Sequence, residues 1–250
     1  MKTRKTEWTA LTVYMRYVFN SVAKWNLGLA LVVPPLNILV LVSLIPSFTS
    51  QLMLTLVSWT SFLYSVFAII AAYAFASDLS RGTYTIFLSQ PLTRRGYVIT
   101  WMLAIAVAPA TAYLLSLVIP FVVIDIRLIK SFDPIDFLLL FLEGAFLSMV
   151  IFLAGLISRR PELVAVIGVF MHIILFIILG IIYSLTYHFS RSHELIALIY
   201  AIVYPFKSKV FQLTLQYAGV THWAAYANLA LSIMLITIAI EYSKRKFEVM

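Results

Sequence analysis

Two polar residues within long apolar segments are the first candidates for chemistry in this sequence of 250 residues. Glu143 lies roughly two helical turns from the end of one segment, and His172 lies near the middle of the next. If these segments cross a bilayer, an ionisable side chain inside them is costly to bury and is a functional candidate by default. Glu143 is also near enough to its end to reach the interface or pair with an external cation, and His172 also fits a hydrogen-bonded packing residue. We therefore treat both as candidate intramembrane polar or translocation residues, with a structural role as the alternative.

The sequence contains serine, aspartate and histidine, which catalysis or metal binding uses, but their spacing does not match a known catalytic or metal-binding motif. Ser58, Ser61 and Ser65 lie in the segment 52–77, but serines in an apolar helix usually bond to backbone or to neighbouring helices. Asp133 and Asp136 flank Pro134, which is typical of a turn that leads into a helix. The sequence has no His-Glu-x-x-His motif and no cysteine, and its other histidines lack metal-ligand spacing. We expect no enzymatic activity, no metal site and no cofactor on this chain.

The composition predicts that the chain is an all-α membrane protein with a single domain over residues 1–250. Hydrophobic residues make up 63% of the sequence and charged residues 11%, and the mean hydropathy is +1.01. A soluble domain of this composition would leave much of its apolar surface in water. The net charge of +8 is best explained by topology, because Lys and Arg collect in cytoplasmic loops. No soluble segment is long enough to form a folded basic face for nucleic acid.

Six apolar segments are close to the length of about 20 residues that a bilayer requires. They are 27–46, 52–77, 98–124, 137–157, 163–189 and 222–240. Pro34 and Pro35 predict a kink or a broken turn in the first span. Ala68, Ala72 and Ala76 form a stripe of small residues that lets another helix approach the second span closely.

Two further apolar segments are predicted to lie at the membrane without crossing it. Residues 7–26 have apolar residues at helical spacing on one face and Arg16 and Lys24 on the other, which favours an amphipathic helix in the membrane interface. The alternative is an amphipathic helix packed on a neighbour. Residues 195–206 are too few to cross and contain Pro205, so we expect an external re-entrant or interfacial hairpin there.

The distribution of cations predicts a cell-membrane protein with both termini in the cytoplasm. Most of the Lys and Arg residues fall in the N-terminal segment, the loop 78–97, the pair Arg159 and Arg160, and the C-terminal tail. The opposite side receives Arg127, Lys130, Arg191, Lys207 and Lys209. Six spans place the first group inside, whereas counting 195–206 as a seventh crossing would place the tail outside. The aromatic residues near span ends are expected to be interface anchors: Trp25, Tyr97, Trp101 and Trp223.

The cytoplasmic loop 78–97 resembles a signature of the type-2 ABC exporter permeases. The residues that carry the resemblance are Gly82-Thr83 and the run from Phe87 to Arg95, which reads Phe-Leu-Ser-Gln-Pro-Leu-Thr-Arg-Arg. The family follows this loop with Gly-Lys, where this chain has Thr100-Trp101. The predicted plan of an interfacial helix, six spans and an external re-entrant segment is also similar to that of the family.

The resemblance implies a permease subunit of an ATP-driven export system. It implies a second permease copy, a pathway lined by the first, second and fifth spans, and alternating access or lateral release. It also implies that the loop is a coupling helix that docks a separate ATPase, through the following residues: Gly82, Thr83, Phe87, Leu88, Pro91, Arg94 and Arg95.

The phosphate-binding motif Gly-x-x-x-x-Gly-Lys-Ser/Thr is absent from the sequence, so ATP and Mg²⁺ are expected on the ATPase partner. The alternative function is a membrane scaffold or assembly subunit without transport. A membrane-embedded enzyme would need catalytic groups that the sequence does not present.

Overall fold

The computed structural model describes residues 2–44, 50–82, 93–124, 134–189, 193–209 and 222–246. These residues are almost entirely helical and include no strand. The helices are α1 (Lys2–Leu44), α2 (Ser50–Ser80), α4 (Arg94–Met102), η2 (Leu103–Val107), α5 (Ala108–Ile124), α7 (Pro134–Ser158), α8 (Pro161–Val169), η3 (Phe170–Ile174), α9 (Leu175–Phe189), α10 (His193–Val203) and α12 (His222–Lys246). The two η elements are π-helical turns within longer helices. The prediction of an all-α chain is confirmed for the described residues.

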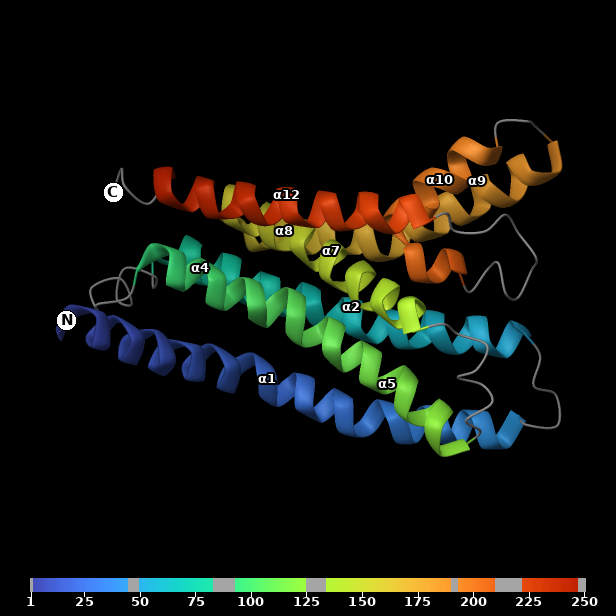
Figure 1. Cartoon of the computed structure of the whole chain (residues 1–250), viewed down its shortest axis with the longest axis horizontal. Coiled ribbons are helices and arrows are strands. Elements are labelled where there is room, and N and C mark those ends of the chain that lie inside the picture. The colour runs from blue at the N-terminus through green and yellow to red at the C-terminus, as the bar shows by residue number, and fades with distance from the viewer. Residues whose placement is uncertain are drawn as a thin grey trace.

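The long helices run side by side along one axis of a bundle, and the shorter α10 lies beside α9 at one end (Figure 1). Among the described residues, five apolar helices are long enough to cross a membrane. They are Leu56–Ser80, Arg94–Pro120, Ile135–Ser158, Pro161–Ile182 and Ala224–Lys244. The first predicted span, 27–46, includes the shorter apolar stretch Gly28–Val40 and ends beyond the described residues of α1. The described chain is therefore compatible with a multi-pass membrane protein.

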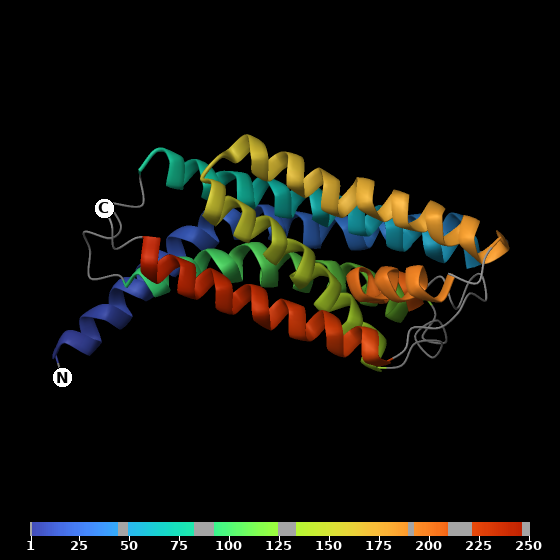
Figure 2. The ribbon, with the colours of Figure 1, turned by 90° about the horizontal axis from the view of Figure 1, so that it is seen from above.

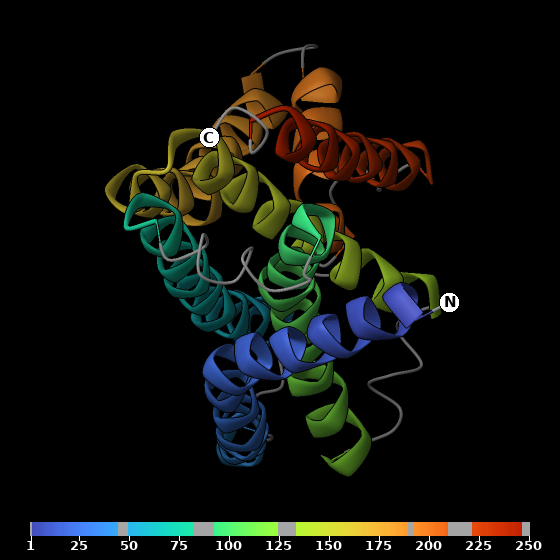
Figure 3. The same ribbon diagram turned by 90° about the vertical axis from the view of Figure 1, so that its left-hand side faces the viewer.

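Helix α1 differs from the two elements predicted for it. It is one continuous helix through Pro34 and Pro35, without the predicted break. Its first part crosses the bundle obliquely, whereas the remainder follows the bundle axis (Figures 2 and 3). Tyr14, Val18 and Val22 are buried in the protein core, so this apolar face packs on the protein, as in the alternative that the sequence left open.

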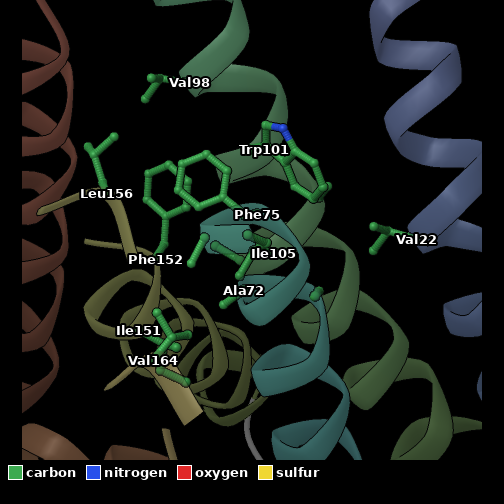
Figure 4. Close-up of a cluster of buried hydrophobic side chains, with 14 of the residues drawn as sticks. Val22, Ala72, Phe75, Val98, Trp101, Ile105, Ile151, Phe152, Leu156 and Val164 are labelled. Carbon is green, nitrogen blue, oxygen red and sulfur yellow. The ribbon is translucent and has the colours of Figure 1, made fainter. Parts of the chain in front are cut away.

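An aromatic cluster joins α1, α2, α4 and α7 (Figure 4). Trp101 Nε1 donates a hydrogen bond of 2.8 Å to the Tyr14 hydroxyl, and the rings of Phe75 and Phe152 stack with centroids 4.7 Å apart. Burial, together with the nearby Tyr97, raises the pKa of the Tyr14 hydroxyl, which therefore stays neutral. Tyr97 and Trp101 are only 1% and 3% exposed. The prediction that these two residues are interface anchors is wrong, because their helix turns them into the bundle.

The stripe of small residues on α2 lies in a close helix contact, as predicted. Ala68, Ala72 and Ala76 are buried. On the facing helices, a Cβ atom at Gly155 would lie 3.6 Å from the Ala76 side chain. A Cβ atom at Gly168 would lie 2.5 Å from Cγ1 of Ile69, which is too close for any real contact. Gly168 is therefore required for the approach of α8 to α2.

Asn37 satisfies a carbonyl group that a proline leaves without its helical donor. The Ser116 carbonyl would accept from the backbone of residue 120, but Pro120 has no N–H. Asn37 Nδ2 donates to that carbonyl at 3.0 Å and to Thr60 Oγ1 at 3.1 Å. The buried amide thus ties α1 to α2 and α5, in surroundings where an unpaired backbone group is costly.

We expect Gly168→Ala to lower thermal stability in detergent, because the new methyl group forces Ile69 to move. Overpacking of this kind costs about 1–3 kcal/mol. Gly180→Ala is the matched control, because nothing lies within 4 Å of its Cβ position. Equal melting temperatures of the two variants would show that α2 and α8 do not approach this closely.

We expect Asn37→Ala to destabilise the bundle by about 1 kcal/mol, in the range of hydrogen bonds between membrane helices. The loss should shrink in a Pro120→Ala background, since residue 120 can then donate to the Ser116 carbonyl. A double-mutant cycle of thermal stability measures this coupling. Strictly additive effects would contradict the assigned hydrogen bond.

Candidate functional site

The candidate site surrounds a helix break at Tyr204. Helix α10 ends at Val203, the chain bends at Tyr204, and residues 205–209 are helical again. Pro205 explains the break, because its ring clashes with the carbonyl four residues earlier and it has no N–H to donate. Helices α10 and α12 both begin at the end of the bundle opposite to the chain termini (Figure 1). This arrangement agrees with a hairpin over 195–206, whose membrane position stays a prediction.

Glu143 of α7 accepts hydrogen bonds from the backbone N–H groups that have no helical acceptor after this break. In an uninterrupted helix the N–H groups of Phe206 and Lys207 would donate to carbonyls four residues earlier. Here both donate to Glu143 Oε2, at 3.0 Å and 3.1 Å. The Ile202 carbonyl, which loses Phe206 as its donor, accepts from Asn228 Nδ2 at 2.7 Å. Glu143 is 1% exposed and acts as a helix N-cap supplied from another helix.

Glu143 also neutralises a buried lysine. Lys207 Nζ lies 3.0 Å from Glu143 Oε1 as an ion pair, and its side chain is 3% exposed. The same ammonium group lies over the rings of Phe176 and Tyr204, at 4.8 Å and 4.9 Å from their centroids. Glu143 therefore pairs with a cation, whereas the external position predicted for that cation stays a prediction.

Lys207 is buried inside the bundle, and the prediction that it and Lys209 lie on the external side stays a prediction. A second pair joins the same two elements, with Lys209 Nζ at 3.8 Å from Asp136 Oδ1. Asp136 and Glu143 are about two turns apart on α7, so they lie on the same face. Two carboxylates of α7 thus hold two lysines of one short segment.

His172 lies next to this centre in the π-helical turn η3. Ser65 Oγ donates to the Ser61 carbonyl at 2.7 Å, so its single proton is used. The contact of 2.8 Å between Ser65 Oγ and His172 Nδ1 then requires Nδ1 to donate. His172 is thereby a hydrogen-bonded packing residue, as the sequence suggested. Its Nε2 atom is left as an acceptor, and it is buried with no hydrogen-bond partner among the described residues.

The π-helical turn and the broken segment are tied to each other. The Tyr204 hydroxyl donates to the carbonyl of Met171, which lies within η3. A π-helical turn leaves a backbone carbonyl without its usual partner, and such turns are frequent at functional sites. Tyr204 therefore connects the bend after α10 with the turn that carries His172.

Two cavities border the polar centre. One of about 20 Å³, enough for one water molecule, is bordered by Ser61, Ser65, Glu143 and His172. The other, of about 160 Å³, is bordered by His172, Lys207, Ser58 and Ser61 together with apolar side chains. The structure thus brings the two predicted residues, Glu143 and His172, to one region. It adds Lys207, whose position just after a proline-broken apolar run was the available signal.

The predicted loop 78–97 is shorter than expected and is capped at both ends. Residues 78–80 belong to α2, and residues 94–97 belong to α4. Gly82, with φ of +71°, ends the turn after α2 in a conformation that glycine adopts without strain. Thr93 Oγ1 accepts from Gly96 N at 3.1 Å and is the N-cap of α4. The following predicted docking residues lie outside the described part of the chain: Thr83, Phe87, Leu88 and Pro91.

Arg94 and Arg95 occupy the first turn of α4, which contains no acidic residue. Cations there oppose the helix dipole and are unfavourable.

The start of α1, the ends of this loop and the end of α12 lie at one end of the bundle (Figure 1). The turn with Arg159 and Arg160 lies at the same end (Figure 2). The predicted cation-rich side is thus one physical end of the bundle.

Comparison of the sequence with protein-family models and with curated proteins finds no match. Among the described residues, no group of three or more His, Asp or Glu side chains is placed to hold a metal ion.

We expect Glu143→Ala to lower stability by about 3 kcal/mol, because it leaves a buried lysine and two backbone N–H groups without their partner. Glu143→Gln keeps an acceptor and should cost less. Thermal unfolding in detergent measures both. The control is Glu241→Ala, which removes the exposed pair with Lys244 and should cost about 0.5 kcal/mol. A loss at Glu143 no larger than at Glu241 would contradict the assigned role.

Proposed function

We propose that this chain is the membrane-spanning permease subunit of an ATP-driven ABC export system. In this proposal six helices cross the cell membrane, with 27–46 as the first span and 195–206 as an external re-entrant segment. Both termini and the loop between α2 and α4 are cytoplasmic. A separate ATPase subunit carries ATP and Mg²⁺, and a second permease copy completes the pathway.

The observation that carries the proposal is the capped loop with its arginines. Gly82 and Thr93 mark where the turn after α2 and the start of α4 lie, on either side of the predicted docking residues. Arg94 and Arg95 each oppose the α4 dipole at a cost of about 0.3–1 kcal/mol, which an acidic surface on a partner would offset. The apolar Phe87 and Leu88 between the caps suit a hydrophobic groove on the same partner.

A connection from this loop to the buried polar centre supports a coupling role. Helix α2 ends at the loop, and farther along it Ser65 binds His172. Helix α2 also packs closely on α8, which leads directly into the turn that carries His172. A push on the loop would therefore be transmitted along rigid helices to the region of Glu143 and His172. This places both residues as candidates for the translocation path.

We expect tagged protein, purified in mild detergent from the cells that produce it, to retain an ATPase polypeptide with a phosphate-binding loop. Phe87→Asp and Arg94→Glu should each reduce the amount recovered or its stimulated ATP hydrolysis by about tenfold, which corresponds to the loss of a docking contact of about 1.4 kcal/mol. Arg16→Glu is the matched control, because Arg16 is an exposed cation of α1.

Failure to recover an ATPase, or recovery that the loop variants leave unchanged, would overturn the docking proposal. A scaffold without transport gives a different result. It would retain the partner through the loop, but ATP hydrolysis by the partner would not change when Phe87→Asp weakens the contact. Rates of ATP hydrolysis of the complex in proteoliposomes separate the two functions.

A further inference from the structure

The larger cavity beside His172 is bordered by two ionisable side chains, His172 and Lys207, by Ser58 and Ser61, and by an apolar wall. We propose that it binds the hydroxylated end of a small or lipid amphiphile. In this site the ligand hydroxyl donates its proton to His172 Nε2 and accepts a hydrogen bond from Lys207 Nζ. The apolar part of the ligand lies against Phe62, Phe176 and Ile177.

The orientation of His172 is fixed by its other ring nitrogen. Nδ1 is held by Ser65, which borders the smaller cavity and not the larger one. Nε2 lies at the opposite edge of the imidazole ring from Nδ1, it is buried without a hydrogen-bond partner among the described residues, and His172 borders the larger cavity. His172 is 8% exposed, so this acceptor is screened from bulk solvent. A buried acceptor without a partner is costly, and a ligand that donates to it removes that cost.

Lys207 brings donors to the same cavity without an excess of charge. One side of its ammonium group faces Glu143 at 3.0 Å, and its surroundings otherwise include the rings of Phe176 and Tyr204. An ammonium group has three N–H donors, so a donor remains for a ligand oxygen. Because Glu143 already balances the charge, the site does not require an anion.

His172 and Lys207 together favour a hydroxyl among common ligand groups, and the hydroxyls of Ser58 and Ser61 on the same border can also bind one. A carboxylate or phosphate ester has no proton for His172 Nε2 when it is ionised. An ammonium group would donate to Nε2 but would be repelled by Lys207. A hydroxyl has one donor and two acceptor positions, and it satisfies both residues at once.

The size and wall of the cavity define the rest of the ligand. Its volume of about 160 Å³ is close to that of a cavity that holds one benzene molecule. Phe62 and Ile177, at its border, are exposed on the outer surface of the bundle. An amphiphile can therefore reach the cavity from this outer surface of the bundle. The site belongs to one copy of the chain and does not depend on the proposed ATPase partner.

The test uses the whole chain in nanodiscs, with 4-fluorophenol as the hydroxylated probe and fluorobenzene as its matched analogue. Titrations are followed by ¹⁹F NMR, and partitioning into empty nanodiscs is subtracted. We expect 4-fluorophenol to bind about tenfold more tightly than fluorobenzene, as expected for a buried hydrogen bond. Equal affinity of the two probes, or binding of neither, would overturn the proposal.

Two substitutions separate the ligand contact from folding. His172→Asn places an amide where Nδ1 binds Ser65 but has no group at the Nε2 position. It should keep the melting temperature near that of the wild type and lose the preference for 4-fluorophenol. His172→Gln places an amide oxygen near the Nε2 position and should keep part of the preference. An undiminished preference in a folded His172→Asn protein would overturn the assignment.

Competition identifies the source of the ligand. Dioleoylglycerol, a lipid with a single free hydroxyl, is added to nanodiscs that contain bound 4-fluorophenol. Displacement of the probe supports the site and assigns it to a lipid. Retention of the probe, with the preference lost in His172→Asn, supports the site and assigns it to a free small molecule.

Discussion

The need to satisfy backbone groups at the Pro205 break shapes the centre of this protein. Two amide donors have no helical acceptor there, and Glu143 accepts from both. A carboxylate in these apolar surroundings needs a cation, which Lys207 supplies at 3.0 Å. Lys207 in turn is buried only because Glu143 and two aromatic rings surround it. The bend, the ion pair and the adjoining cavity therefore form one unit, and none of its parts is stable alone.

The same rule explains polar residues elsewhere in the bundle. Asn37 binds the carbonyl that Pro120 leaves without a donor, and Tyr204 binds the Met171 carbonyl of a π-helical turn. The turn η2 ends two residues before Pro109, which has no N–H to donate to the carbonyl four residues earlier, within η2. Each irregularity lies inside the protein, where side chains can replace the missing backbone partner. Buried polar side chains in the bundle thus replace the backbone hydrogen bonds that its prolines and π-helical turns remove.

Sequence patterns predicted what depends on neighbouring residues and missed what depends on distant ones. Composition and periodicity predicted the helices, the alanine stripe of α2 and the start of α7 at Pro134. The partnership of Glu143 and Lys207 was not predictable, because about sixty residues separate them and a lysine after an apolar run is typical of a loop. Tyr97 and Trp101 have the residue types and positions of interface anchors, yet the rotation of their helix buries them. The docking residues from Thr83 to Pro91 stay a prediction, whereas their flanks, Gly82 and Thr93, have a clear role as helix caps.

Site-resolved amide hydrogen exchange of the protein in nanodiscs tests the central claim most directly, namely that Glu143 holds the backbone at the break. We predict that the amides of Phe206 and Lys207 exchange slowly in the wild-type protein, because Glu143 binds both. In Glu143→Ala these two amides should exchange at least about tenfold faster, whereas amides in the middle of α7 stay protected. Rapid exchange of Phe206 and Lys207 in the wild-type protein, or protection that persists in Glu143→Ala, would contradict this account.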